Sequence, residues 1–137
     1  MVASLVGCNA EDITEKDFKP ITLAEVRSLT TGKEASKTLL VDTRLPSKFD
    51  AGHIPGSRNL QLADAKARTG EVLNPELDRF KTLIVYGEDP GSPSAKAMTM
   101  RLMVLQHSGV RIFEGGIAEW LRAGLPVEKA PAAAKQP

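Results

Sequence analysis

The chain has 137 residues, enough for one compact domain with its own core. It is 42% hydrophobic and 26% charged, and its net charge is only +1. Its Lys and Arg residues are scattered, and one Trp, one Tyr and four Phe offer few rings for stacking on bases. These features exclude a typical nucleic-acid-binding protein and favour an ordinary globular domain.

Cysteine and histidine are scarce. Cys8 is the only cysteine, so neither an intrachain disulfide nor a zinc site built from cysteines can form. Besides it, only His53 and His107 offer soft metal ligands. We therefore expect no metal site and no cofactor.

Residues 1–17 are expected to be a leader and a polar linker. Within them, LVGC at 5–8 resembles the lipobox of bacterial lipoproteins, in which the cysteine is lipidated after signal cleavage. The apolar stretch before Cys8 is short, and no basic residue precedes it. Either the chain begins inside a longer signal, which predicts a cell-envelope or periplasmic protein anchored through Cys8, or the match is chance and the protein is cytoplasmic.

The folded unit is expected over residues 18–128, with a disordered Ala/Pro tail at 129–137. Apolar runs predict strands at Thr38–Asp42, Thr82–Tyr86 and Val110–Phe113. Helical spacing of apolar residues predicts helices over 22–29, over the segment that carries Met98 and Leu102, and over 116–123. Such alternation predicts an α/β fold with a parallel sheet.

Two motifs resemble the rhodanese-like domain family. VDTR at 41–44 leads into FDAGHIPGS at 49–57, which is similar to the signature that follows an early strand of that family. EGGIAEWLRAGLPV at 114–127 resembles its C-terminal signature. The resemblance covers residues 22–127. It implies a central parallel sheet of about five strands with helices on both faces.

The same resemblance places the family's catalytic cysteine at Gly87. In rhodaneses a strand delivers that cysteine into a loop whose N–H groups and following helix stabilise a thiolate and its persulfide. Glycine carries no sulfur, so we expect no catalytic residue. A cysteine introduced at Gly87 is expected to be accessible, with a pKa near the ordinary ~8.5 because of the neighbouring acidic residues.

The rest of the loop also departs from the family pattern. Two prolines lack N–H groups, two acidic residues disfavour anions, and the usual basic residue is absent, so anion binding should be poor. The loop is about as long as that of the related dual-specificity phosphatases, but without Cys and Arg its length gives no phosphatase. Ser92 is expected to cap the next helix and Pro93 to start it. The degenerate loop comprises Gly87, Glu88, Asp89, Pro90, Gly91, Ser92, Pro93 and Ser94.

Three further residues are expected to flank the pocket. Asp42 ends a strand where α/β proteins place their sites, and Arg44 follows it, although a local salt bridge would also explain both. His53 could be a general base or a hydrogen-bonding element of its turn, and the turn favours the second. Ser92 or Ser94 could replace the thiol only with a base beside the loop, and no pattern brings His53 or His107 there.

The sequence therefore predicts a catalytically inactive rhodanese-like domain that serves as a binding or scaffold module. Its partner would be an unidentified protein or small molecule at the degenerate loop, with no nucleic acid, and with a membrane only through a lipid on Cys8. The alternative is a sulfurtransferase-type enzyme, acting on thiosulfate or persulfide sulfur, that uses a thiol supplied in trans. A third interpretation, part of a membrane-anchored assembly, depends on lipidated Cys8.

Overall fold

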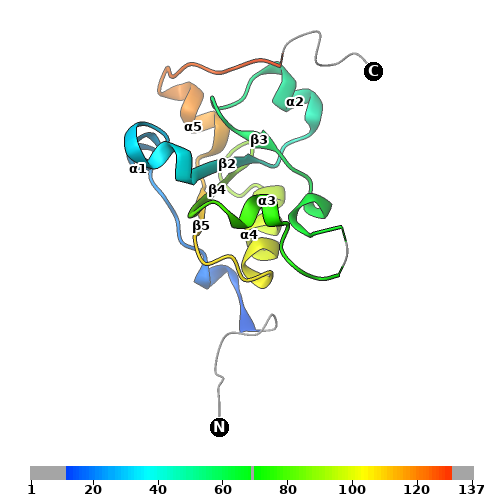
Figure 1. Cartoon of the computed structure of the whole chain (residues 1–137). Coiled ribbons are helices and arrows are strands. Elements are labelled where there is room, and N and C mark those ends of the chain that lie inside the picture. Colours follow the sequence, from blue (N-terminus) through cyan, green and yellow to red (C-terminus); the bar gives the residue numbers. More distant parts are fainter. Residues whose placement is uncertain (1–11, 69, 131–137) are drawn as a thin grey trace.

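The computed structural model describes residues 12–68 and 70–130. Its centre is a sheet of four parallel strands in the order β3-β2-β4-β5, visible in the middle of Figure 1. The strands are β2 (Thr38–Asp42), β3 (Arg58–Asn59), β4 (Thr82–Tyr86) and β5 (Val110–Phe113). The three strands predicted from the sequence are confirmed at the predicted bounds. Their apolar residues are almost all buried, as expected for strands covered on both faces.

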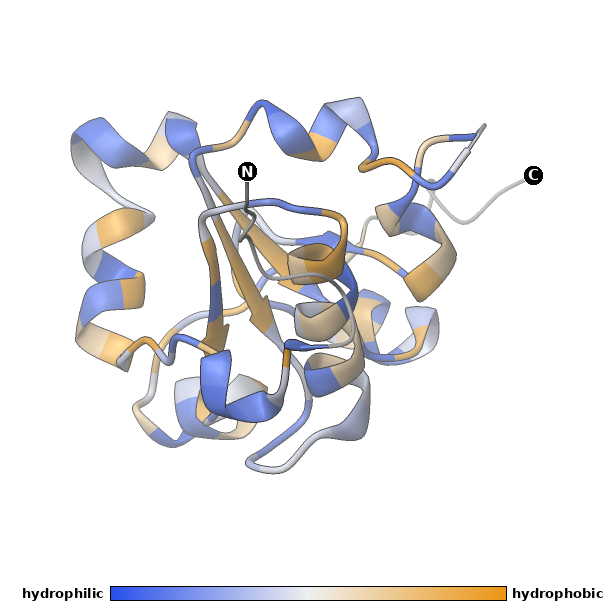
Figure 2. Cartoon of the chain, turned by 90° about the horizontal axis from the view of Figure 1, so that it is seen from below, coloured by the Kyte–Doolittle hydropathy of each residue, from blue (hydrophilic) through white to orange (hydrophobic). Residues whose placement is uncertain are grey.

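Helices cover both faces of this sheet. On one face, α4 (Pro93–Val104) and α3 (Pro75–Asp78) pack through Met98, Leu102 and Leu77 against alternate strand residues such as Val41 and Val85. On the other, α1 (Leu23–Leu29) and α5 (Gly116–Arg122) pack through Val26, Ile117 and Trp120 against Leu40 and Ile84. The hydrophobic strands enclosed by more polar helices are seen in Figure 2. The predicted α/β class is confirmed.

Short elements complete the chain. The helix α2 (Pro46–Ala51) follows β2, and 3-10 turns lie at η2 (Glu15–Asp17), η3 (Gly32–Lys37) and η4 (Leu62–Ala65). Thr22 caps α1 through a capping box with Glu25, which explains where that helix begins. None of the helices in the described part of the chain is long and apolar enough to cross a membrane.

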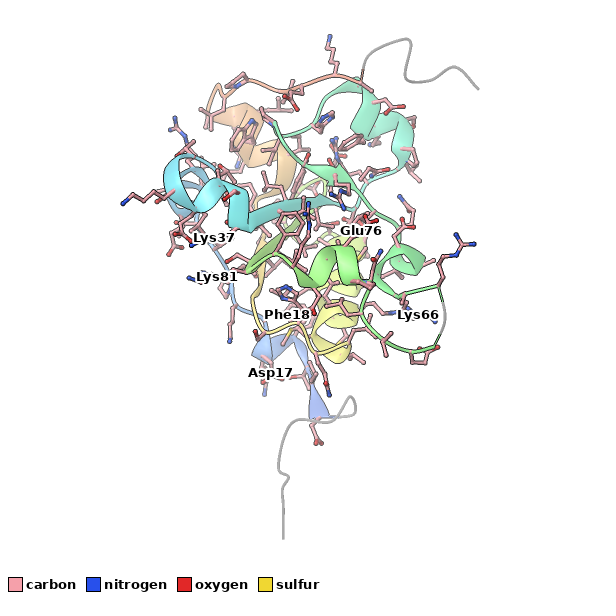
Figure 3. The ribbon with its side chains drawn as sticks, in the orientation of Figure 1. Asp17, Phe18, Lys37, Lys66, Glu76 and Lys81 are labelled. Carbon is pink, nitrogen blue, oxygen red and sulfur yellow. The ribbon has the colours of Figure 1, made fainter. Side chains whose placement is uncertain are left out.

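One expectation needs correction. The sheet has four strands rather than about five, because the stretch next to β5 makes only an isolated parallel bridge between Pro20 and Ile112. Backbone structure is also described on both sides of the predicted unit at 18–128. The turn η2 precedes it, and the N–H of Ala130 donates to the Asp50 carbonyl at 3.0 Å. Phe18, labelled in Figure 3, packs against the core on the α4 face.

Candidate functional site

The loop at residues 87–94 lies at the carboxyl end of the sheet, where it joins β4 to α4. The strands β2 and β5 end beside it, because Asp42 pairs with Tyr86 and Tyr86 pairs with Phe113. In open α/β sheets this edge is where ligands bind. The structure thus brings the loop and Asp42, which we expected to flank the pocket, to one edge of the sheet.

Gly87 is buried, and the space beside it is already filled. A Cβ atom built on Gly87 would overlap Ser92 Oγ and would lie 2.7 Å from Ser92 Cβ, closer than real Cβ atoms approach. The φ of Gly87 lies outside the left-handed region, so the obstacle is space rather than backbone torsion. A cysteine here would therefore require Ser92 to shift, and the expectation that its thiol would be accessible stays a prediction. Sequence could not reveal this crowding, because the obstruction comes from the other end of the loop.

Ser92 fills this space while it caps α4. Its hydroxyl accepts a hydrogen bond from the N–H of Ala95 at 3.3 Å, and Pro93 occupies the first helical position. Ser92 Oγ also lies 3.1 Å from Ser94 Oγ, which lies 2.9 Å from Thr43 Oγ1. A chain of hydroxyls therefore holds the start of α4 against the end of β2. The expected cap is confirmed.

The loop is further fixed by α5. The N–H groups of Ile117 and Ala118 donate to the carbonyls of Gly87 and Glu88, each at 3.0 Å. This close approach requires Gly116, which has a φ of +63°. A Cβ at Gly116 would lie 2.6 Å from the Gly87 carbonyl oxygen. The Gly-Gly pair of the C-terminal motif thus serves to dock a helix on the loop.

The acidic part of the loop faces α2 on one side and solvent on the other. Glu88 Oε1 lies 3.4 Å from Lys48 Nζ and 3.8 Å from Arg44 NH1, and its side chain is 46% exposed. Asp89, Pro90 and Gly91 are exposed, and the Asp89 carbonyl accepts the N–H of Ser92 at 3.2 Å. The Ser92 N–H is therefore already hydrogen-bonded within the loop.

Asp42 and Arg44 form a buried ion pair. Arg44 donates from Nε and NH2 to the Asp42 carboxylate, with NH2 to Oδ2 at 2.9 Å, and NH2 also donates to the Gly52 carbonyl at 2.6 Å. Burial works to lower the pKa of Arg44, but the hydrogen bond and charge of Asp42 outweigh it and raise that pKa above its ordinary value. The pair joins the end of β2 to the turn after α2, as a structural salt bridge would.

His53 has a structural environment. Its Nδ1 is 2.7 Å from the Phe49 carbonyl, its ring stacks on the Phe49 ring with centroids 3.7 Å apart, and Nε2 lies 3.6 Å from Glu128 Oε1. His107 lies at the opposite end of the sheet, with Nε2 2.8 Å from the Phe80 carbonyl and Nδ1 accepting from the Gly109 N–H at 3.0 Å. Neither ring contacts Ser92 or Ser94, so the serine-nucleophile alternative gains no base.

Tyr86 was not singled out from the sequence, yet it organises this edge. Its hydroxyl accepts from the Ile54 N–H at 3.2 Å and lies 2.9 Å from Ser57 Oγ. Burial, with the charge of Asp42, raises the pKa of Tyr86 well above its ordinary value. An aromatic residue that ends a strand gives little signal of such a role in sequence.

Cys8 lies outside the described residues. Within the described ranges, no group of three or more His, Asp or Glu side chains is placed to hold a metal ion. A family model described as "Rhodanese-like domain" matches residues 22–123.

The chain belongs to the rhodanese-like domain family. This confirms the resemblance drawn from the two motifs, which both lie almost wholly within the matched range.

One curated relative of this rhodanese-like chain is the HTH-type transcriptional regulator Rv0324 of Mycobacterium tuberculosis, 31% identical over 124 residues. That alignment covers 90% of this chain, and the chain spans about half of the relative's length, 51%. About half of the regulator therefore lies outside the alignment with this chain.

Solved structures share the rhodanese-like fold. A Rhodopseudomonas palustris protein of unknown function, described as a possible tyrosine phosphatase, matches with a TM-score of 0.68 at 20% identity, over 93% of this chain and all of that chain. A human single-domain sulfurtransferase matches with a TM-score of 0.60 at 22% identity, over 75% of this chain and 95% of that chain. At these identities the likeness establishes the fold alone.

Proposed function

We propose that this rhodanese-like domain is catalytically inactive and acts as a binding or scaffold module through the edge that carries the loop at residues 87–94. The observation that carries the proposal is the state of Gly87, where the family resemblance places the nucleophile. Gly87 offers no thiol, and Ser92 fills the space that a side chain on Gly87 would need.

The remaining loop contacts support the same function. Sulfur transfer needs N–H groups that converge on an anion. Here Pro90 and Pro93 have no N–H, and the Ser92 N–H donates to the Asp89 carbonyl. The negative charges of Glu88 and Asp89 oppose a sulfur anion inside the loop itself, whereas Lys48 and Arg44 lie outside the loop, on its α2 side. A stiff, closed loop suits recognition, because little conformational entropy is lost when it binds.

The mycobacterial relative adds context. It is described as a transcriptional regulator, and this chain aligns with about half of it. A rhodanese-like segment inside a regulator is consistent with a binding role, whereas the human structural neighbour is described as a sulfurtransferase. The catalytic alternative, in which another molecule supplies the thiol, has no contact in this loop that favours it.

A turnover assay tests the proposal. The purified chain and its Cys8→Ser variant should both show no transfer of sulfur from thiosulfate to cyanide above a buffer blank. The variant is needed because Cys8 is the only cysteine of the chain. Turnover that survives in Cys8→Ser would contradict the proposal. Turnover that appears only after a small thiol is added would support the alternative with a thiol in trans.

A further inference from the structure

A hollow beside the loop combines charged and apolar walls. It has a volume of about 310 Å³ and lies between α2, α5 and the start of the loop. Small-molecule sites are typically of about this size or larger, mostly apolar, with a few converging polar groups. Its lining side chains are Arg44, Lys48, Ala51, Glu88, Ile117, Leu121 and Val127.

The charged groups of the hollow meet at one carboxylate oxygen. Glu88 Oε1 lies 3.4 Å from Lys48 Nζ and 3.8 Å from Arg44 NH1. Strong charge-assisted hydrogen bonds measure about 2.7 to 2.9 Å, so Glu88 is further from both Lys48 and Arg44 than such bonds require. Because Glu88 is half exposed, it can turn away from both cations into solvent.

Arg44 is built into this wall. Its side chain is only 7% exposed, and Asp42 and the Gly52 carbonyl hold its Nε and NH2 atoms in place. NH1 is the part of the guanidinium that reaches Glu88 across the hollow. A fixed guanidinium loses little entropy when a second carboxylate binds to it.

The apolar wall of the hollow is formed by α5 and by the segment that follows it. Ile117 is buried, whereas the neighbouring Leu121 is 53% exposed, one of four large apolar side chains in the described residues that are left open to solvent. Val127 follows α5 and also lines the hollow. An apolar group placed here would cover Leu121 and lie within reach of the two cations.

We propose that this hollow binds a small organic monocarboxylate with an apolar body, whose carboxylate replaces that of Glu88 on Arg44 and Lys48. The inference rests on the proposed function and names the ligand class of that binding module. Charge complementarity supports it. Asp42 already neutralises Arg44, so turning Glu88 into solvent leaves one uncompensated positive charge, shared by Lys48 and Arg44 NH1, which a monocarboxylate would match. The side chain of Glu88 acts as an internal stand-in for the ligand.

Hexanoate is the probe, titrated into the whole chain and followed by two-dimensional amide NMR. Saturable shifts should be confined to residues that line the hollow. Each added CH₂ from acetate to hexanoate should tighten binding by up to about fourfold while the hollow accommodates it. Hexan-1-ol should bind at least about threefold more weakly than hexanoate, because it cannot pair with the cations.

Three variants make the test specific. Lys48→Gln should weaken hexanoate binding by about two- to fivefold, and Glu88→Gln should strengthen it by a similar factor. Lys96→Gln is the matched control, because Lys96 lies on α4 and also has a single carboxylate partner, Glu15, at 3.4 Å. It should leave the affinity unchanged.

The inference is overturned if hexanoate shows no saturable shifts at the hollow, if hexan-1-ol binds as tightly, or if Lys48→Gln and Lys96→Gln behave alike. These results are independent of sulfur turnover. A chain that neither binds hexanoate nor transfers sulfur would refute this inference alone, and a chain that transfers sulfur in the Cys8→Ser form would refute the proposed function.

Discussion

Replacing Gly116 by Ala should destabilise the domain through the contact between α5 and the degenerate loop. Gly116 has a φ of +63°, a conformation that costs an alanine on the order of 1 kcal/mol. The new Cβ would also lie 2.6 Å from the Gly87 carbonyl oxygen and 2.9 Å from the Glu88 carbonyl group. Backbone atoms cannot turn aside, so relieving this overlap costs about 1 to 3 kcal/mol more. The total is about 2 to 4 kcal/mol.

Gly124 supplies a matched control for this substitution. It also has a positive φ, +76°, but a Cβ there would meet nothing within 4 Å. Gly124→Ala should therefore cost only the torsional part, about 1 kcal/mol. The difference between the two variants isolates the contact with the loop.

Urea unfolding measures both free energies. The fluorescence of Trp120, the only tryptophan, and far-ultraviolet circular dichroism should report one coincident transition. The midpoint should fall further for Gly116→Ala than for Gly124→Ala, with unchanged slope. Equal losses in the two variants would refute the claim that α5 is docked on the loop backbone.

Two other predictions concern the buried groups at the same edge. Burial raises the pKa of Tyr86, so the folded state keeps the phenol proton. The free energy of unfolding should be unchanged below pH 10.0, the ordinary pKa of tyrosine, and should fall as the pH rises above it. The phenolate absorbance of this single tyrosine should appear together with unfolding rather than before it. Asp42→Ala should cost about 3 kcal/mol in urea unfolding, because it leaves the Arg44 charge buried without its carboxylate, and a cost below about 1 kcal/mol would mean that Glu88 replaces Asp42.

Local patterns predicted much of the fold. The strands β2, β4 and β5 could be placed because each is a short apolar run rich in Val, Ile or Leu that both faces of the sheet must bury. Helix starts were equally readable, because the hydroxyls of Thr22 and Ser92 cap the following turns. These are short-range properties of the chain.

Features that depend on distant contacts were not predictable. Lys19 and Pro20 show no strand pattern in the sequence. The Ile112 N–H nevertheless donates to the Lys19 carbonyl and the Ile21 N–H donates to the Ile112 carbonyl, each at 3.0 Å. Backbone pairing of this kind leaves no side-chain pattern. The pairing of Glu88 with Lys48, forty residues away in the chain, likewise has no local signature.

The loop shows the same limit most clearly. The family resemblance placed the nucleophile position at Gly87 and predicted an open place for a thiol. The structure differs because Ser92, chosen in the sequence as a helix cap, turns its side chain into that place. Spacing along the chain predicts that Ser92 caps the helix, but it does not predict that the Ser92 side chain fills the space beside Gly87.

The most direct test of the proposal that the loop is closed and catalytically inactive is the labelling rate of a thiol placed at its start. In a protein that carries both Cys8→Ser and Gly87→Cys, the introduced thiol should react with a disulfide probe far more slowly when the protein is folded than when it is unfolded in urea. Adding Ser92→Gly should speed the folded-state reaction, because it removes the side chain that crowds Gly87. A Gly87→Cys protein that is labelled equally fast folded and unfolded, and that transfers sulfur from thiosulfate to cyanide, would contradict the account.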